Sequence, residues 1–159
     1  MNTRQYATLS FLSFSLVAVA VALQVYGYQG VSFMPCPLCV LQRIGYLGIA
    51  FSCLLAIGIK PWRKAFHLFA TLFAYFGVAV AGHHVWLLSH PSSSCGIDPL
   101  EVFVNKFSLA QAIPWLFKAD GFCSAKLPTI IGLEVPEWSF VWFLLFAVLL
   151  SATLFKKRL

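Results

Sequence analysis

Four long apolar runs divide the chain, and each is close to the length of a membrane-spanning helix. They cover residues 7–28, 40–59, 65–88 and 138–155. About 20 apolar residues in a helix cross the roughly 30 Å of hydrocarbon in a bilayer. More polar segments, each with at least one proline, separate the runs, at residues 29–39, 60–64 and 89–137. The pattern predicts an all-α membrane protein in which a single domain, residues 1–159, is a bundle of four transmembrane helices.

The second outer loop, residues 89–137, has a helical pattern of its own. Asp98 is placed to cap a helix whose first residue is Pro99, a position that proline favours. Apolar residues follow at helical spacing, with polar residues opposite them: Leu100, Phe103, Val104 and Phe107. We therefore predict a short amphipathic helix that lies on the membrane surface, and packing against the bundle is compatible with this placement.

The composition agrees with a membrane protein. Of the 159 residues, 60% are hydrophobic and 10% are charged, and the mean hydropathy is +0.85. A soluble domain has about 25% charged residues. This composition excludes an ordinary soluble enzyme or a soluble binding domain.

Basic residues are distributed unevenly between the two sides that alternating spans define. Seven of the 11 lie on one side: Arg4, Lys60, Arg63, Lys64, Lys156, Lys157 and Arg158. All 5 acidic residues lie on the other side. An excess of Lys and Arg marks the cytoplasmic side, so we expect both termini in the cytoplasm. The net charge of +6 is then mainly an orientation signal, which argues against nucleic-acid binding.

A CxxC motif lies between the first two apolar runs. Cys36 and Cys39 can close a small disulfide ring, and such pairs are often redox-active. Pro37 is favoured as the first residue of a helix, which would place Cys39 in the first turn, where the helix dipole favours a thiolate. Arg43 follows one helical turn later on the same face, so a permanent cation lies near that sulfur. The motif alone leaves a structural disulfide or half of a zinc site open.

The chain has three other cysteines, one within an apolar run and two in the second outer loop. Cys53 lies in the middle of the second apolar run, where a lone thiol is expected to be a packing residue. Cys95 and Cys123 lie in the second outer loop. Four outer cysteines allow three pairings, of which proximity and loop closure favour Cys36 with Cys39 and Cys95 with Cys123. Disulfides persist on the non-cytoplasmic side, in agreement with the predicted orientation.

Histidines within a span are costly and are functional candidates. His83 and His84 come at the outer end of the third apolar run, on the same side as Arg43. We expect one of the two to face the bundle interior and the other to face lipid or headgroups. His67, at the inner end of the same run, is expected to face the headgroups.

Over essentially its whole length the chain resembles the bacterial inner-membrane disulfide bond formation protein B (DsbB) family. The resemblance is carried by Cys36-Pro37-Leu38-Cys39 with Gln42-Arg43, by His84-Val85-Trp86-Leu87, by Cys95 and Cys123, and by Gly132-Leu133-Glu134-Val135-Pro136. It implies a protein-disulfide oxidoreductase of the bacterial inner membrane. Such an enzyme reoxidises a periplasmic thioredoxin-fold dithiol protein, DsbA or a similar one, and passes the electrons to a membrane quinone, either ubiquinone or menaquinone.

The resemblance also implies roles for single residues. Cys95 would form the mixed disulfide with the partner, and Cys123 would be its partner within the loop. Cys36 would receive electrons from the loop, and Cys39 would be the thiolate that faces the quinone. Arg43 and His84 would lie at the quinone. Gln42 is given no role, and no metal is implied.

Two other classes of protein remain open. One is a quinone-linked enzyme similar to vitamin K epoxide reductase, although in those proteins the CxxC usually comes late in the chain. The other is a non-enzymatic membrane scaffold, either stapled by disulfides or holding zinc through cysteine and histidine. Bound quinone in the purified protein would favour an enzyme, and stoichiometric zinc without quinone would favour the scaffold.

Overall fold

The computed structural model describes residues 1–31, 33–90, 99–123 and 128–155. Its longest elements are four helices: α1 (Thr3–Tyr26), α2 (Pro37–Gly58), α3 (Arg63–Ser89) and α7 (Val135–Phe155). Each of the four includes a stretch long and apolar enough to cross a membrane. The prediction of an all-α, multi-pass membrane protein is confirmed.

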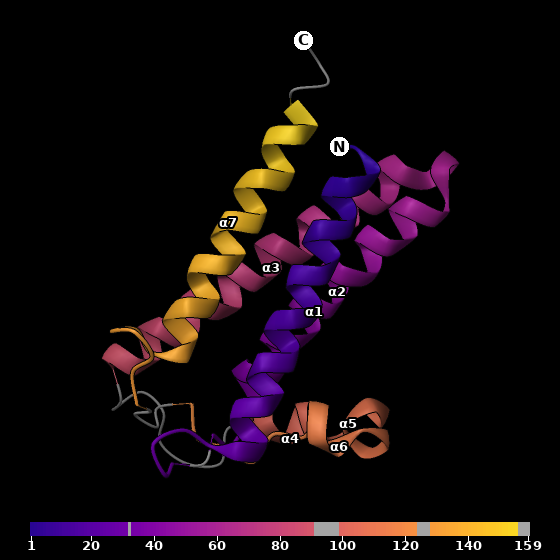
Figure 1. Cartoon of the computed structure of the whole chain (residues 1–159). Helices are drawn as coiled ribbons and strands as arrows, with labels where there is room; N and C mark the ends of the chain where they lie inside the picture. Colours follow the sequence, from indigo (N-terminus) through magenta and orange to yellow (C-terminus); the bar gives the residue numbers. More distant parts are fainter. Residues whose placement is uncertain (32, 91–98, 124–127, 156–159) are drawn as a thin grey trace.

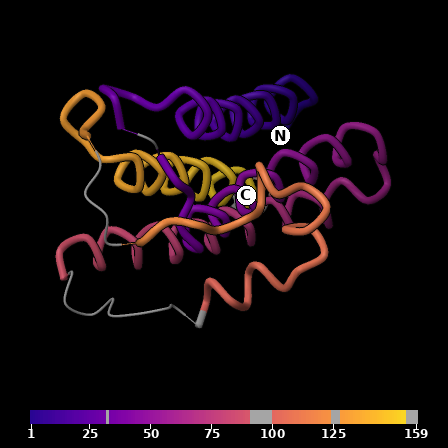
Figure 2. The backbone as a smooth tube through the Cα atoms, turned by 90° about the horizontal axis from the view of Figure 1, so that it is seen from below, coloured from indigo at the N-terminus to yellow at the C-terminus, as the bar shows by residue number. Residues whose placement is uncertain are grey.

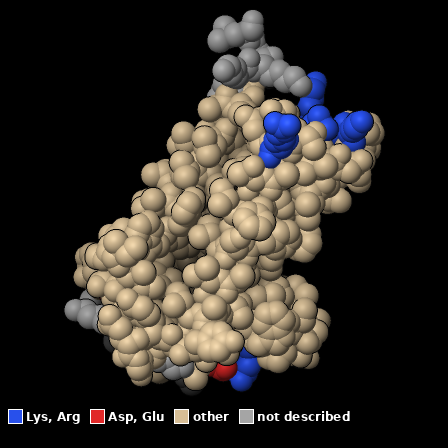
Figure 3. Space-filling view, viewed as in Figure 1, with Lys and Arg blue, Asp and Glu red and all other residues tan. Residues whose placement is uncertain are grey.

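Short helices connect the long ones. The turn η1 (Lys60–Trp62) joins α2 to α3, and three helices precede α7: α4 (Pro99–Asn105), α5 (Ser108–Ala112) and α6 (Pro114–Phe117). Figure 1 shows α4, α5 and α6 together at one end of the bundle, while α1 begins and α7 ends at the other end. Figure 3 shows Lys and Arg side chains gathered at the end where α1 begins.

Local capping decides where the first two long helices begin. The Asn2 side chain accepts a hydrogen bond from the Gln5 backbone N–H, and the Gln5 side chain accepts one from the Asn2 backbone N–H, which closes a capping box. Helix α1 therefore starts before the apolar run at residue 7. Helix α2 starts at Pro37, as predicted, and the Cys36 side chain caps it by accepting a hydrogen bond from the Cys39 N–H.

The bundle is built around α2, which packs between α1 and α3, while α3 also packs against α7. Figures 1 and 2 show this arrangement from two directions. The Phe143 ring of α7 lies where Gly45 of α2 and Gly77 of α3 leave room for it, and a Cβ at Gly77 would overlap the ring. The same ring stacks on Tyr46, with centroids 4.0 Å apart. Small residues at these positions allow the three helices to approach closely.

The structure corrects the expectation for His67. Its side chain is buried instead of facing headgroups. One ring nitrogen lies 3.1 Å from the Tyr6 hydroxyl oxygen and the other 3.1 Å from the Leu150 carbonyl oxygen, so the imidazole joins α1, α3 and α7. A buried histidine is tolerated because its polar atoms find such partners. Cys53, in contrast, is fully buried in the apolar core, as expected for a packing residue.

The loop between α3 and α7 contains more structure than the pattern predicted. Helix α4 begins at Pro99 as predicted, but its apolar side chains are divided between two environments. Val104 is buried in a cluster that includes Val40 of α2, whereas Phe103 is exposed. The Asn105 side-chain amide donates to the Ala119 carbonyl and accepts from the Ala119 N–H, both at 2.8 Å. These bonds hold the segment that leads to the last cysteine against α4.

Candidate functional site

The CxxC motif forms the N-terminus of α2. Cys36 is the capping residue and Cys39 lies in the first turn, as predicted. The two sulfur atoms are 3.0 Å apart, and both residues are thiols in this structure. Cys36 is buried, with 2% of its surface exposed, while Cys39 is partly exposed. The dipole of the helix terminus favours negative charge at Cys39.

Cys123 lies beside this pair. Its side chain is within hydrogen-bonding reach of the Cys36 thiol, and it is itself buried. Its position is fixed by the preceding residues, because the Asp120 and Gly121 N–H groups both donate to the Pro35 carbonyl, at 3.0 Å and 3.1 Å. Cys95, its expected partner, lies outside the described residues.

Cys36 is thus between two other thiols. Hydrogen bonding of the Cys36 thiol to Cys123 and then to Cys39, together with burial, raises the pKa of the Cys36 thiol above its ordinary value. A thiol with a raised pKa is a poor nucleophile and a poor leaving group at neutral pH. When it is part of a disulfide, an incoming thiolate therefore attacks its sulfur, and the sulfur of the partner cysteine leaves. The arrangement therefore favours attack at Cys36, with Cys39 as the departing sulfur.

His84 connects the CxxC motif to the Cys123 segment. Its Nε2 lies 3.1 Å from the Cys123 carbonyl oxygen and 3.7 Å from the Cys36 sulfur, and its Nδ1 lies 3.2 Å from Nε2 of Gln42. A carbonyl oxygen can only accept, so Nε2 carries the hydrogen and Nδ1 accepts from the Gln42 amide. The prediction that one of the two neighbouring histidines faces inward is confirmed, because His84 is buried and His83 is exposed.

Gln42 is the site residue that the sequence analysis missed. It is buried and contacts His84. In the sequence it was part of the motif that carries the resemblance, and it lay three residues after Cys39 on the same side of a helix, but neither signal gave it a role. Its contact with His84 crosses from α2 to α3, so helical spacing could not reveal it.

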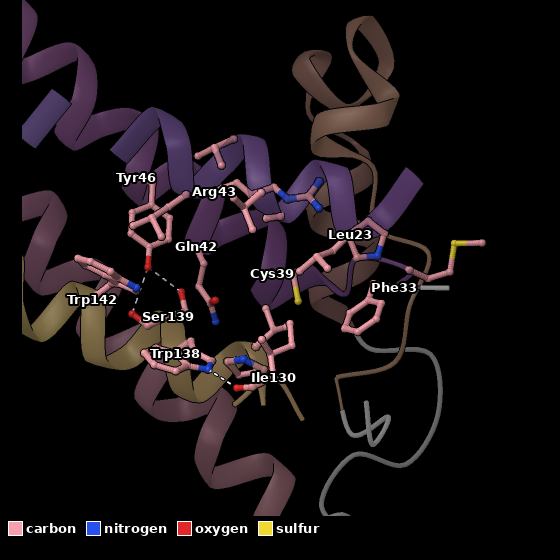
Figure 4. A pocket seen from close by; sticks show the side chains of 18 residues that line it. Leu23, Phe33, Cys39, Gln42, Arg43, Tyr46, Ile130, Trp138, Ser139 and Trp142 are labelled. Carbon is pink, nitrogen blue, oxygen red and sulfur yellow. Dashed lines mark hydrogen bonds between the residues drawn. The ribbon is translucent and has the colours of Figure 1, made fainter. Parts of the chain in front are cut away.

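A cavity of about 230 Å³ opens on the other side of Cys39. Figure 4 shows Arg43, Gln42 and Tyr46 of α2 on one side of it, and Trp138, Ser139 and Trp142 of α7 on the other. Its remaining wall includes apolar side chains of α1, such as Leu16 and Leu23. A mostly apolar cavity with a few polar groups is the usual form of a small-molecule site. Among its described lining residues Cys39 is the only cysteine, and His84 is absent.

Arg43 is buried at the edge of this cavity. Its guanidinium donates one hydrogen bond to the Leu116 carbonyl oxygen at 3.0 Å and one to the Gln24 side-chain oxygen at 2.9 Å. It interacts electrostatically with the sulfur of Cys39 and, more weakly, with that of Cys36. A guanidinium has five N–H donors, so these two bonds leave others for a bound molecule.

We expect Gly121→Ala to separate Cys123 from Cys36. A Cβ at Gly121 would overlap the Met34 carbonyl oxygen, which is backbone and cannot move aside alone. In a variant that also carries Cys39→Ser and Cys95→Ser, the disulfide between Cys36 and Cys123 should form about tenfold more slowly. The rate is measured by quenching an oxidation with a thiol-alkylating reagent. Gly58→Ala is the control, because its Cβ meets nothing within 4 Å, and equal rates in both variants would contradict the expectation.

Comparisons with known proteins identify the family of this chain. The sequence model of the family described as "Disulfide bond formation protein DsbB" matches residues 3–153. A protein of Cupriavidus necator named Disulfide bond formation protein B is 44% identical over 159 residues, which cover 99% of this chain and 96% of the relative. A protein of the same name in Cupriavidus pinatubonensis is 42% identical with the same coverage.

A match over a shorter part of the chain points to the same family. Disulfide bond formation protein B 1 of Pseudomonas syringae pv. syringae is 42% identical over 126 residues, which cover 78% of this chain and 75% of the relative. The family model reaches from the start of α1 to residue 153 in α7 and includes Cys36, Cys39 and Cys123. This chain, a multi-pass membrane protein with a thiol cluster at one end of its bundle, therefore belongs to the DsbB family of disulfide bond formation proteins.

Proposed function

We propose that this protein reoxidises a periplasmic thioredoxin-fold dithiol protein and passes the electrons to a membrane quinone. Membership of the DsbB family establishes the coarser role, disulfide formation at a membrane. The observation that carries the finer proposal is the order of groups at the end of the bundle. Cys123 contacts Cys36, Cys36 contacts Cys39, and Cys39 lines the cavity beside Arg43.

The thiol chemistry follows this order. In the oxidised site, the Cys123 thiolate attacks the Cys36 sulfur. A bond forms between Cys123 and Cys36, the Cys36–Cys39 bond breaks, and Cys39 leaves as a thiolate. Attack of the Cys95 thiolate on Cys123 then restores the loop disulfide and releases Cys36. The loop is oxidised and the CxxC pair is reduced by two electrons, without a metal.

The partner step uses the same chemistry. A thiolate of the partner attacks Cys95, which forms a mixed disulfide and releases Cys123 as the thiolate that the next exchange needs. The second partner thiolate then attacks the mixed disulfide, so that the partner leaves oxidised and Cys95 is free to attack Cys123. Each partner molecule thus supplies two electrons, and its own disulfide forms.

The residues around the cavity fit a quinone. Its head carries two carbonyl oxygens that need hydrogen-bond donors. Arg43, which has N–H groups beyond the two that bond Leu116 and Gln24, lines the cavity together with the aromatic Trp138 and Trp142. The apolar side chains of α1 suit a hydrocarbon tail. When bound, the quinone accepts two electrons and two protons. The guanidinium of Arg43 stabilises the thiolate of Cys39, because an unpaired anion would be costly in a medium of low dielectric.

The proposal is tested with purified protein in detergent. We expect it to contain quinone, identified by solvent extraction and mass spectrometry, and to catalyse reduction of added quinone by a reduced thioredoxin-fold partner with one disulfide formed per quinone consumed. Quinone consumption is followed by absorbance and partner thiols by alkylation. Protein that forms no partner disulfide under these conditions would overturn the proposal.

A separate expectation concerns orientation. We expect both termini in the cytoplasm and Cys36, Cys39, Cys95 and Cys123 on the periplasmic side, because Lys and Arg gather at the end of the bundle where α1 begins. A membrane-impermeant thiol reagent should label the reduced cysteines in cells whose outer membrane alone is permeable. Labelling of Cys36 that requires disruption of the inner membrane would show the reverse orientation.

A further inference from the structure

The thiol cluster has the composition of a soft-metal site. The sulfur atoms of Cys36 and Cys39 and a ring nitrogen of His84 all lie within 4.8 Å of one another. The Cys123 thiol adjoins Cys36. Three thiols and an imidazole, brought together from α2, α3 and the loop before α7, are the ligands that zinc takes in Cys₃His sites. We propose that the reduced form of this protein binds one Zn²⁺ through Cys36, Cys39, Cys123 and Nε2 of His84.

The distances are near those that tetrahedral zinc needs. With Zn–S of about 2.3 Å and Zn–N of about 2.0 Å, neighbouring ligand atoms lie about 3.5–3.8 Å apart. The Cys36 and Cys39 sulfurs are 3.0 Å apart, and the Cys36 sulfur is 3.7 Å from the His84 nitrogen. The ligand atoms of Cys36, Cys39 and His84 therefore lie near the spacing of a zinc site, and Cys123, which adjoins Cys36, has to move closer to the other two to serve as the fourth ligand.

The neighbouring groups can support the metal. Zinc binding at Nε2 breaks its hydrogen bond to the Cys123 carbonyl and moves the ring hydrogen to Nδ1. The Gln42 amide, which now donates to Nδ1 at 3.2 Å, can present its oxygen to Nδ1–H after a half-turn. Zinc-bound histidines usually donate their second N–H to such an acceptor.

Charge is also balanced in the buried site. Three thiolates and Zn²⁺ carry a net charge of −1, and binding releases the protons of those ligands that are still thiols. The guanidinium of Arg43, which interacts with the sulfurs of Cys39 and Cys36, offsets this charge. A charge-compensated metal cluster is therefore compatible with burial.

This site exists only while the cysteines are reduced. A Cys36–Cys39 disulfide removes two thiolate ligands, so the metal and the disulfide exclude each other. Bound Zn²⁺ would hold the thiols reduced and stop the exchange chemistry, which gives the protein a metal-inhibited state beyond its proposed oxidase activity. The inference concerns the thiols and His84 and does not require a bound quinone.

The full-length protein in detergent, reduced with a phosphine under anaerobic conditions, is the material for the test. We expect isothermal titration with Zn²⁺ to give one site in the reduced protein and none in the oxidised protein. In His84→Ala the affinity should fall about tenfold or more. His83→Ala is the matched control, since His83 is the adjacent residue, is exposed, and should leave the affinity unchanged.

Further variants keep the test decisive. Cys39→Ser should also weaken binding about tenfold or more, and it replaces His84→Ala if thermal unfolding shows that the latter does not fold. Reduced wild-type protein that takes up no Zn²⁺ would overturn the assignment. So would a folded His84→Ala or Cys39→Ser variant that binds Zn²⁺ as tightly as the wild type does. Dithiol oxidation with quinone in zinc-free buffer, measured separately, tests the proposed function alone.

Discussion

Cys123→Ser and Cys95→Ser are each expected to lower oxidation of a thioredoxin-fold partner on the order of 10³-fold or more, as expected when a covalent group is removed. Quinone reduction by a small dithiol should persist in both variants. Cys123 is the thiol that contacts Cys36, so its loss removes the attacking sulfur of the exchange. Cys36 and Cys39 remain at the start of α2, next to the cavity, where a small dithiol can reduce their disulfide directly.

Two assays on each variant separate these expectations. Partner oxidation is measured by alkylating the remaining partner thiols, and quinone reduction by absorbance with dithiothreitol as the donor. Cys53→Ala is the control, because Cys53 is buried in the core and contributes to neither step. If the loop variants also lose quinone reduction with dithiothreitol, electrons do not pass from the loop to the CxxC pair in the proposed order.

Arg43→Ala is expected to raise the KM for quinone about 10–100-fold, the effect of losing hydrogen bonds from a charged donor. The KM for the dithiol partner should stay the same, since the loop cysteines do not change. Arg43 is buried beside Cys39, and its guanidinium is held by the Leu116 carbonyl and the Gln24 side chain. Arg43→Lys should recover only part of the loss, because an ammonium lacks the planar fork that reaches several acceptors at once.

Gln24→Ala serves as the matched variant. It removes one hydrogen bond that orients Arg43 but leaves the cation in place, so its KM for quinone should lie between those of wild type and Arg43→Ala. Helical content and thermal unfolding are compared for all three variants. Wild-type quinone kinetics in folded Arg43→Ala protein would show that Arg43 only stabilises the helix packing and would remove the case for quinone at this cavity.

The four long helices could be predicted because their signals are local. Each apolar run is long enough to cross a bilayer. Pro37 after Cys36 predicts the start of a helix, and α2 begins at Pro37. The nearness of Cys39 to Arg43 follows from helical spacing alone. The order His83 and His84 at the end of α3 also predicted that one ring faces inward.

Contacts between distant segments were decided by the tertiary structure. The sequence did not show that Gln42 meets His84, because one lies on α2 and the other on α3. His67 was expected at the surface, but its partners, Tyr6 and Leu150, come from two other helices. Helices α5 and α6 are too short for a periodic pattern to reveal them.

The sequence by itself therefore determined the membrane class, the four helices and the position of the CxxC pair at the start of α2, since hydrophobicity, helix capping and helical spacing act over a few residues. Only the tertiary structure placed Cys123 against Cys36 and opened a cavity at Cys39. These features depend on how α1, α2, α3 and α7 pack and on backbone bonds such as those to Pro35. Packing of this kind joins residues that are far apart in the chain, where no local pattern connects them.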